Sequence, residues 1–419
     1  MFKKALALTA ILTIVVAVAV ANAAEPDISD GQSAARYIRT LQNTDGGFPA
    51  FGVDSSPGAT IDATFAFVSA GKDPTRVKSS AGNSPDDYLA PQAGAYSADP
   101  GAAAKLALGV SLMELDPANF GGVDLLSIMA SNFNNGTGEY GLDVFDEVFY
   151  MLALVQEGQS VPPPATAYMA SLQQPDGGWE FLPGFGTDTN TAAMVVQALV
   201  AAGMAPDDPV IVDGLGYLAT AQNTDGGFGF LAGEPSDPNS TAVIIQALVA
   251  AEQDLDEGGP WAPSNNTPLE GLLAFRNPAN GAFQFFGGDS AFATYQALPA
   301  LVLGAFPAVV PPAGVGTADT DGDGCPDADE EGSDEQQGGQ RNYMNPWDYF
   351  NPTQDGENRV DDVLAVVLEY FNDAPIGEYS SLTDRTYEGP NAWNLNDPNG
   401  QQRVDDILAA VKSYFHDCG

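Results

Sequence analysis

Residues 319–330, in the last quarter of the chain, have the types and spacing of a calcium-binding loop. Their sequence is DTDGDGCPDADE. Oxygen ligands at alternate positions let a short loop wrap around a hard cation, and a glycine at position 6 permits the sharp turn. Gly324 occupies that position. The alternative is a solvated acidic linker. The expected calcium ligands are Asp319, Asp321, Asp323, Cys325 through its backbone carbonyl, Asp327 and Glu330.

Two later segments repeat each other. NPTQDGENRVDDVLAVVLEYF at 351–371 matches LNDPNGQQRVDDILAAVKSYF at 395–415, so each copy pairs a candidate calcium loop with an apolar helix. The first copy offers Asn351, Thr353, Asp355 and Asp362 as ligands. The second has Leu395 at position 1 and retains Asp397, Asn399 and Asp406. We expect two apolar stripes to pack against each other, with packing against a partner protein as the alternative. The stripes are Val363, Leu364, Val367 and Phe371 in one helix and Ile407, Leu408, Val411 and Phe415 in the other.

These motifs resemble two known families. The loop at 319–330 looks like a thrombospondin type 3 repeat, because little helical pattern precedes it. The twin loop–helix segments resemble a dockerin, whose paired calcium units bind cohesin domains. Their glycines lie 400 − 356 = 44 residues apart, which is wider than in a compact dockerin. The resemblance implies calcium as the cofactor and a cohesin-like or cell-surface protein as a partner.

The composition restricts the chemistry of the whole chain. Its 419 residues include 14 Lys and Arg against 56 Asp and Glu, a net charge of −42. Nucleic acid and anionic lipid are disfavoured as partners, because both require a basic face. His416, Cys325 and Cys418 are the only possible His or Cys ligands for zinc, and all lie in the last quarter. Chemistry elsewhere must therefore proceed without His or Cys.

The first 24 residues have the pattern of an export signal. Lys3 and Lys4 precede an apolar run over 5–21, and small residues follow at 21–23. An uncleaved membrane anchor is the alternative. We expect a secreted or cell-surface protein with no membrane span after cleavage. In an oxidising compartment Cys325 and Cys418 are expected to form a disulfide, with free or intermolecular thiols as the alternative.

The middle of the chain contains a six-fold repeat. LQNTDGGF at 41–48 returns as AQNTDGGF at 221–228 and as LQQPDGGW at 172–179, and three weaker copies end at Tyr96, Tyr140 and Phe283. A short amphipathic helix precedes each glycine pair, as at 34–41 and 210–219. A helix that is apolar on all sides follows behind a Thr or Ser cap, near Thr191 and Thr241.

Amphipathic helices alternating with fully apolar ones predict an all-α fold. The apolar helices would form an inner ring and the amphipathic helices an outer ring, an α/α toroid of about twelve helices over residues 25–308. An open solenoid is the alternative. Residues 309–318, rich in Pro and Gly, predict a linker to a calcium module at 319–419.

The Gln-x-x-Asp-Gly-Gly-aromatic repeats resemble those of the terpenoid cyclase and protein prenyltransferase toroids, a superfamily that includes the cobalamin carriers. Squalene–hopene-type cyclases use a DxDD motif, which residues 25–308 lack. Prenyltransferases hold zinc through Asp, Cys and His, and this region has neither Cys nor His. The resemblance therefore favours a binding role for the toroid.

A secreted enzyme is the alternative function, either a polysaccharide lyase or hydrolase or an atypical terpene cyclase relative. Asp143, Asp146, Asp188 and Asp237 are the carboxylates that could act. The competing interpretation is that Asp188 and Asp237 cap inner helices.

A ligand site is expected where the N-termini of the inner helices meet at one mouth of the toroid. Free backbone N–H groups and short polar side chains gather there. A ligand with amide or hydroxyl groups would suit this mouth, and a strongly anionic one would not. We expect Thr191 and Thr241 to be half exposed. The residues expected to edge the mouth are Asp188, Asn190, Thr191, Asp237, Asn239 and Thr241.

Overall fold

The computed structural model describes residues 28–307 and part of the C-terminal region. The described C-terminal residues are 325, 330, 341, 345, 349–352, 358–370, 380–386, 395, 398–414 and 416. The predicted signal peptide, 1–24, and linker, 309–318, lie outside them. Within the described ranges, no helix has the length and hydropathy needed to cross a membrane.

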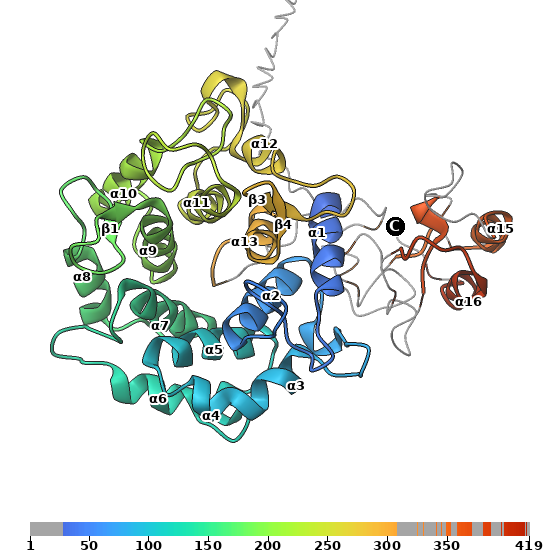
Figure 1. Cartoon of the computed structure of the whole chain (residues 1–419), viewed down its shortest axis with the longest axis horizontal. Coiled ribbons are helices and arrows are strands. Elements are labelled where there is room, and N and C mark those ends of the chain that lie inside the picture. Colours follow the sequence, from blue (N-terminus) through green and yellow to red (C-terminus); the bar gives the residue numbers. More distant parts are fainter. Residues whose placement is uncertain are drawn as a thin grey trace, which may run out of the picture.

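Six helices within residues 28–307 form a closed inner ring (Figure 1). Each contacts the next along the chain, and the last contacts the first. The ring closes, so the toroid is confirmed and the open solenoid is wrong. The inner helices are α2 (Pro57–Ser69), α5 (Pro100–Leu112), α7 (Val144–Gln156), α9 (Thr189–Ala201), α11 (Pro238–Ala250) and α13 (Ala291–Leu301).

A layer of outer helices packs against this ring, and α10 is an example of their packing. Ile211, Leu215 and Leu218 of α10 are buried against the ring, whereas Val212 is half exposed. The second outer helix is broken into α3 and α4 (Ala93–Tyr96). The outer helices are α1 (Ile28–Thr40) on α13, α3 (Pro85–Leu89) on α2, α6 (Leu125–Asn132) on α5, α8 (Pro163–Ser171) on α7, α10 (Pro209–Ala219) on α9 and α12 (Pro268–Leu273) on α11.

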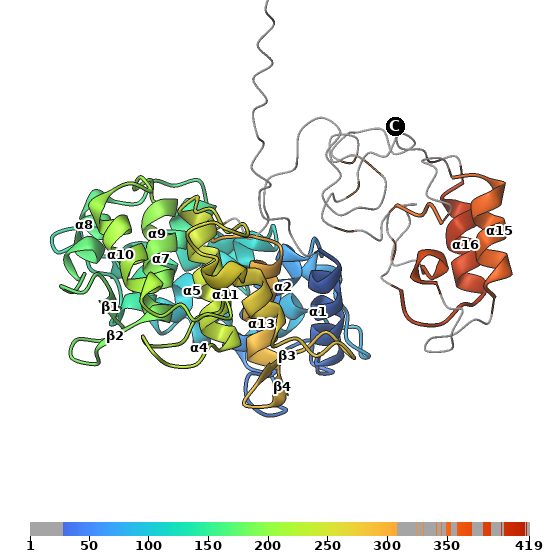
Figure 2. The same ribbon diagram turned by 90° about the horizontal axis from the view of Figure 1, so that it is seen from above.

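Two short antiparallel hairpins precede inner helices. Strand β1 (Trp179–Glu180) pairs with β2 (Thr187–Asp188) before α9, and β3 (Phe283–Phe285) pairs with β4 (Gly288–Ser290) before α13. Figure 2 shows both hairpins on the same side of the ring. The loops that lead into the inner helices therefore define one mouth of the toroid.

The side chains of the Asp-Gly-Gly turns make hydrogen bonds that stabilise the fold. In the fifth copy, Gln222 donates to the carbonyls of Gly226 at 3.1 Å and Trp261 at 2.7 Å. Asp225 accepts from the N–H of Gly227 at 3.0 Å. Gly226 has a φ of +87°, a left-handed conformation that glycine adopts without steric cost and that suits a tight turn. The turn thereby holds the chain after α10 against the segment that leads into α12, the outer helix of the next repeat.

In three repeats the aromatic that follows the turn anchors the inner helix through its backbone N–H. Phe228 is fully buried, and its N–H donates to Thr241 Oγ1 at 2.9 Å. Phe48 makes the same bond to Thr60. Helix α11 begins at Pro238, so Thr241 lies within the helix and does not cap it. Its hydroxyl instead accepts the N–H of Phe228.

Most inner helices are capped by aspartate, which corrects the expected Thr or Ser caps. Asp188 caps α9 by accepting from Thr191 N–H at 2.8 Å, and Asp237 caps α11. Asp143 caps α7 in the same way. Ser56 does cap α2, and Ser290 does cap α13, as expected. The capping interpretation of Asp188 and Asp237 is confirmed.

Two helices of the C-terminal region, α15 (Val360–Leu368) and α16 (Val404–Lys412), lie outside the ring and contact each other (Figure 2). Their contact uses Val366, Ala409 and Ala410, which are buried. The predicted stripes are wrong for Leu364, Val367, Leu408 and Val411, which are 44–57% exposed. The small alanines allow the helices to approach on a different face. Phe371 and Phe415 lie outside the described residues.

The turn geometry predicts a large difference between two glycine substitutions. A Cβ on Gly226 would lie 2.2 Å from the Thr267 carbonyl oxygen, whereas a Cβ on Gly233 would meet nothing within 4 Å. Their φ values are similar, +87° and +83°. We expect Gly233→Ala to lower the free energy of unfolding by about 1 kcal/mol and Gly226→Ala by about 3 kcal/mol or more. Urea unfolding measures both, and equal losses would contradict this role for the turn.

Candidate functional site: a central cavity and its mouth

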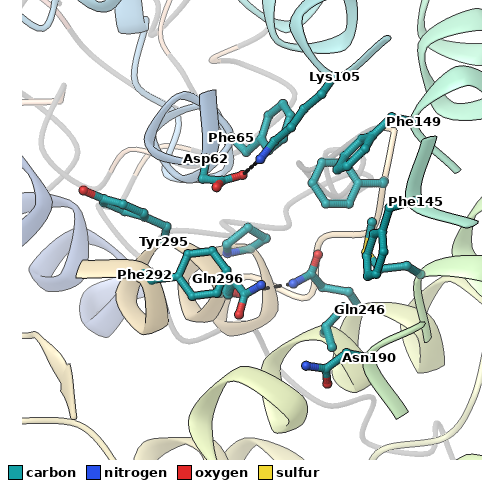
Figure 3. A pocket seen from close by; sticks show the side chains of 14 residues that line it. Asp62, Phe65, Lys105, Phe145, Phe149, Asn190, Gln246, Phe292, Tyr295 and Gln296 are labelled. Carbon is teal, nitrogen blue, oxygen red and sulfur yellow. Dashed lines mark hydrogen bonds and ion pairs between the residues drawn. The ribbon is translucent and has the colours of Figure 1, made fainter. Parts of the chain in front are cut away.

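A cavity of about 270 Å³ lies at the centre of the toroid (Figure 3). All six inner helices contribute to its wall, so the cavity is a product of ring closure. Its lining residues are Asp62, Phe65, Lys105, Phe145, Phe149, Asn190, Met194, Val243, Gln246, Phe292, Tyr295, Gln296, Pro299 and Phe306.

The wall is mainly aromatic, and the chain after α13 supplies part of it. The Phe306 ring packs edge-on against Phe65, with the ring centroids 5.0 Å apart. The N–H of Phe306 donates to Gln197 Oε1 at 3.2 Å. Phe65 and Gln197 lie in the C-terminal halves of α2 and α9. Phe306 therefore closes the cavity on the side opposite the mouth.

The charged residues of the lining are paired with each other. Lys105 Nζ lies 2.6 Å from Asp62 Oδ1, and both side chains are largely buried. The ammonium group also lies 5.5 Å from the centre of the Phe149 ring. The pair presents little net charge to a ligand.

Two amide oxygens in the lining have no hydrogen-bond partner among the described residues. Gln246 Nε2 donates to the Gln296 carbonyl at 3.2 Å, but Gln246 Oε1 is buried and unpartnered. Asn190 Oδ1 is in the same state. A buried acceptor without a donor costs about 1–3 kcal/mol, so both atoms favour a ligand that donates. Gln246 itself is only 3% exposed.

Two grooves extend the site at the mouth. The first, of about 460 Å³, shares Phe145 and Asn190 with the central cavity. The second, of about 520 Å³, shares Phe230 with the first. Their rims carry exposed aromatic rings, among them Phe185 at 75% and Phe286 at 96% exposure. An apolar molecule would therefore meet apolar surface before it reaches the cavity.

The residues expected at the mouth divide into three groups. Asn190 lines both the cavity and the first groove, which Asp188 and Thr191 also line. Asp237 lines the second groove. Asn239 and Thr241 line none of these spaces, and Asn239 Nδ2 donates to Gln296 Oε1 at 2.6 Å. Ligand binding by these residues stays a prediction.

The expected half exposure of two threonines is wrong. Thr191 is 1% exposed and Thr241 is fully buried. Thr191 Oγ1 donates to Asp188 Oδ2 at 2.8 Å, so both its hydroxyl and its N–H are used by the helix cap. Burial raises the pKa of Asp188, and the bonds from Thr191 oppose that rise. The mouth residues are thus largely occupied with capping.

Several lining residues were not identified from the sequence, although a signal existed. Gln246 and Gln296 of the lining, and Gln197, which bonds the lining residue Phe306, each begin a Gln-Ala-Leu triplet in a helix that is mainly apolar. Asp62 and Lys105 likewise interrupt apolar helices. Polar residues at repeated positions of a buried helix indicate an inner wall or an internal bond.

The predicted calcium residues are described only in part. Cys325 and Glu330 are buried, as are Asn351, Asp362 and Asp406, whereas Asn399 is exposed. The predicted ligands outside the described residues are Asp319, Asp321, Asp323, Asp327, Thr353, Asp355 and Asp397. Among the described residues no three His, Cys, Asp or Glu side chains cluster as a metal site. Cys418 also lies outside them, so the disulfide stays a prediction.

Two of these aspartates share full burial and one backbone hydrogen bond. Asp362 accepts from Arg359 N–H at 2.8 Å, and Asp406 accepts from Arg403 N–H at 2.5 Å. Both are fully buried. Burial, with a smaller contribution from the charge of Asp384, raises the pKa of Asp406 to about 7. A cation beside Asp406 would offset both effects.

A buried carboxyl in α7 predicts a pH-dependent stability. Glu147 is 1% exposed; its Oε2 accepts from Tyr140 N–H at 2.7 Å, and its Oε1 has no partner among the described residues. Burial raises the pKa of Glu147 from 4.5 to about 8. Between these pH values the folded state holds a proton that the unfolded state releases, so this stabilisation is complete below about pH 4.5 and is lost as the pH rises to about 8.

We expect Glu147→Gln to remove this loss. The stability of the variant relative to the parent should rise by about 3–5 kcal/mol between about pH 4.5 and pH 8, measured by urea unfolding. Glu257→Gln, in an exposed loop, is the control and should follow the parent. A constant difference between Glu147→Gln and the parent would show that Glu147 is ionised in the fold.

No protein-family model matches this sequence, and no curated protein matches it. Several solved structures have a similar fold. The type II terpene cyclase MstE from Scytonema is 12% identical, with a TM-score of 0.48 over 66% of this chain and 97% of its own. An unsaturated glucuronyl hydrolase from Bacillus sp. GL1 is 13% identical, with a TM-score of 0.47 over 66% of this chain and 95% of its own.

The protein geranylgeranyltransferase-I of Candida albicans, complexed with GGPP, is 11% identical, with a TM-score of 0.45 over 67% of this chain and 92% of its own. These likenesses are too distant to say anything of activity. The toroid assignment rests on the closed ring of helix contacts.

Proposed function

We propose that the toroid binds a neutral, mainly apolar small molecule that carries a hydrogen-bond donor. One observation carries the proposal: an aromatic cavity enclosed by all six inner helices contains an acceptor, Gln246 Oε1, that has no hydrogen-bond partner in the part of the chain that the structure describes. Apolar walls with a few convergent polar groups are typical of ligand sites.

The charge of the protein disfavours an anionic ligand. The chain carries a net charge of −42, which repels anions. In the cavity the ammonium of Lys105 is already paired with Asp62. A ligand would therefore gain most from apolar contact and from a donor placed near Gln246.

Catalysis on a polysaccharide or terpene is the alternative function. Glycoside hydrolysis generally uses two carboxylates that flank the scissile bond. The residues lining the central cavity offer one carboxylate, Asp62, and it is held in an ion pair. Asp143, Asp188 and Asp237 cap helices. These contacts favour binding over the two-carboxylate chemistry.

For the C-terminal region we propose calcium-dependent attachment of an exported protein. Asp362 and Asp406 end their two loops as buried carboxylates, and Asp406 Oδ1 has no hydrogen-bond partner among the described residues. Hard oxygen ligands of this kind fit calcium, which would be held by the predicted loop residues.

Apolar side chains on the two helices offer a surface for that attachment. Leu364 and Val367 on α15 and Leu408 and Val411 on α16 are 44–57% exposed, and the two pairs lie 44 positions apart along the chain. A duplicated apolar surface suits a protein partner of the cohesin-like or cell-surface type that the sequence suggests.

The cavity proposal predicts a preference between two matched probes. 2-Naphthol carries a donor hydroxyl, and 2-methoxynaphthalene has the same ring system without one. We expect calorimetric titration to show about tenfold tighter binding of the naphthol, the equivalent of one hydrogen bond. Gln246→Leu should remove the preference while retaining binding of the ether.

A pair of phenylalanine variants tests whether the probes bind in the central cavity. Val243 lines the cavity, so Val243→Phe should weaken binding of both probes, whereas Val212→Phe on the exposed face of α10 should not. A naphthol preference that survives Gln246→Leu, or equal effects of the two phenylalanine variants, would contradict the proposal.

The calcium proposal predicts two independent unfolding transitions. In about 5 mM calcium, calorimetry of the full chain should show one transition for the toroid and one for residues 319–419. A chelator should abolish the second and leave the first, because binding energy contributes to folding of small metal-bound units. A C-terminal transition that is indifferent to chelator would show that calcium does not stabilise this region.

A further inference from the structure

The second calcium loop lacks a ligand at its first position. The repeat alignment places Leu395 there. Leu395 is 6% exposed and packs in a small core with Phe350, Val366 and Ala409. Its apolar side chain cannot bind a cation, so another residue must complete the loop if the loop binds calcium.

Asp384 reaches this loop from outside the repeat. It precedes Leu395 by 395 − 384 = 11 residues and is fully buried. Its Oδ2 accepts from the N–H of Gly400 at 2.7 Å and of Gln401 at 3.2 Å. A carboxylate held by backbone donors in this way is oriented as metal-ligating carboxylates commonly are.

Comparison of the two repeats assigns Asp384 to position 1. In the first repeat, position 8 is Asn358, whose Nδ2 donates to the carbonyl of Phe350, the residue before Asn351 at position 1. In the second, position 8 is Gln402, whose Nε2 donates to Thr383 Oγ1 at 2.6 Å. Thr383 is the residue before Asp384. The side chain at position 8 thus contacts the residue preceding position 1 in both repeats.

A second buried carboxylate belongs to the same loop. Asp406, at position 12, is fully buried; its Oδ2 accepts from Arg403 N–H, but its Oδ1 has no partner among the described residues. The backbone N–H of Arg385, the residue after Asp384, also bonds the Asp406 carboxylate, which brings the Asp384 segment beside Asp406. Two buried carboxylates in proximity are stable when a cation lies between them.

We propose that Asp384 is the missing first ligand of the second calcium site, with residues 385–396 inserted between ligand positions 1 and 3. The inference rests on the proposed calcium function. Calcium takes six to eight oxygen ligands, and carboxylate and amide side chains with backbone carbonyls supply them. Among the described residues, the proposed side-chain ligands are Asp384, Asn399 and Asp406.

The test counts calcium ions on the full chain by titration calorimetry and native mass spectrometry. Asp384→Asn should remove one calcium, or weaken its binding by at least about tenfold, and leave the other ions bound. Asp405→Asn is the matched control, because it removes the same charge from an exposed neighbour of Asp406 and should leave the count unchanged.

The outcomes distinguish the role of Asp384 from the proposed calcium binding on which it rests. A parent protein that binds no calcium overturns both. A parent that binds calcium together with an Asp384→Asn variant of unchanged count and affinity overturns only the role of Asp384. Amide hydrogen exchange of α16 at saturating calcium shows whether the Asp384→Asn variant folds. If that variant does not fold, Asp384→Glu is measured in its place. Protection of α16 in Asp384→Glu that is lost on chelation supports the site, and protection that does not depend on calcium overturns it.

Discussion

The toroid depends on the need to cover helices that are apolar on every side. Such a helix cannot face water, so each inner helix must have a neighbour on both flanks and an outer helix behind it. A linear array leaves two flanks uncovered, and a closed ring leaves none. Closure is made by the contact of α13 with α2 and by Tyr295, whose hydroxyl donates to the Pro49 carbonyl at 2.9 Å.

Ring closure also buries the few polar side chains of these mainly apolar helices. A polar atom on the inner wall must find a partner in the protein or in a ligand. Gln197 finds the N–H of Phe306, and Asp62 finds Lys105. Gln246 Oε1 and Asn190 Oδ1 have no partner among the described residues, so a ligand can add a hydrogen bond at either atom. The same ring that stabilises the fold thus creates the proposed binding site.

The C-terminal helices are stabilised differently. Their described core is small, built from Phe350, Val366, Leu395 and two alanines. Units with so little apolar burial usually require a metal or a cross-link to remain folded. Buried aspartates at equivalent places in the two repeats are consistent with a metal, and the proposed Cys325–Cys418 disulfide would add a cross-link.

Local sequence alone determined the repeat, the turns at each Asp-Gly-Gly and the alternation of amphipathic with apolar helices, because these depend on glycine conformation and on which faces avoid water. It also allowed Asp188 and Asp237 to be interpreted as caps. Tertiary structure decided which threonines are buried, which face of α15 meets α16, and how Phe306 closes the cavity. It also brought Asp384 to a loop that begins 11 residues later. These outcomes depend on contacts between distant segments, which the local pattern of residues does not encode.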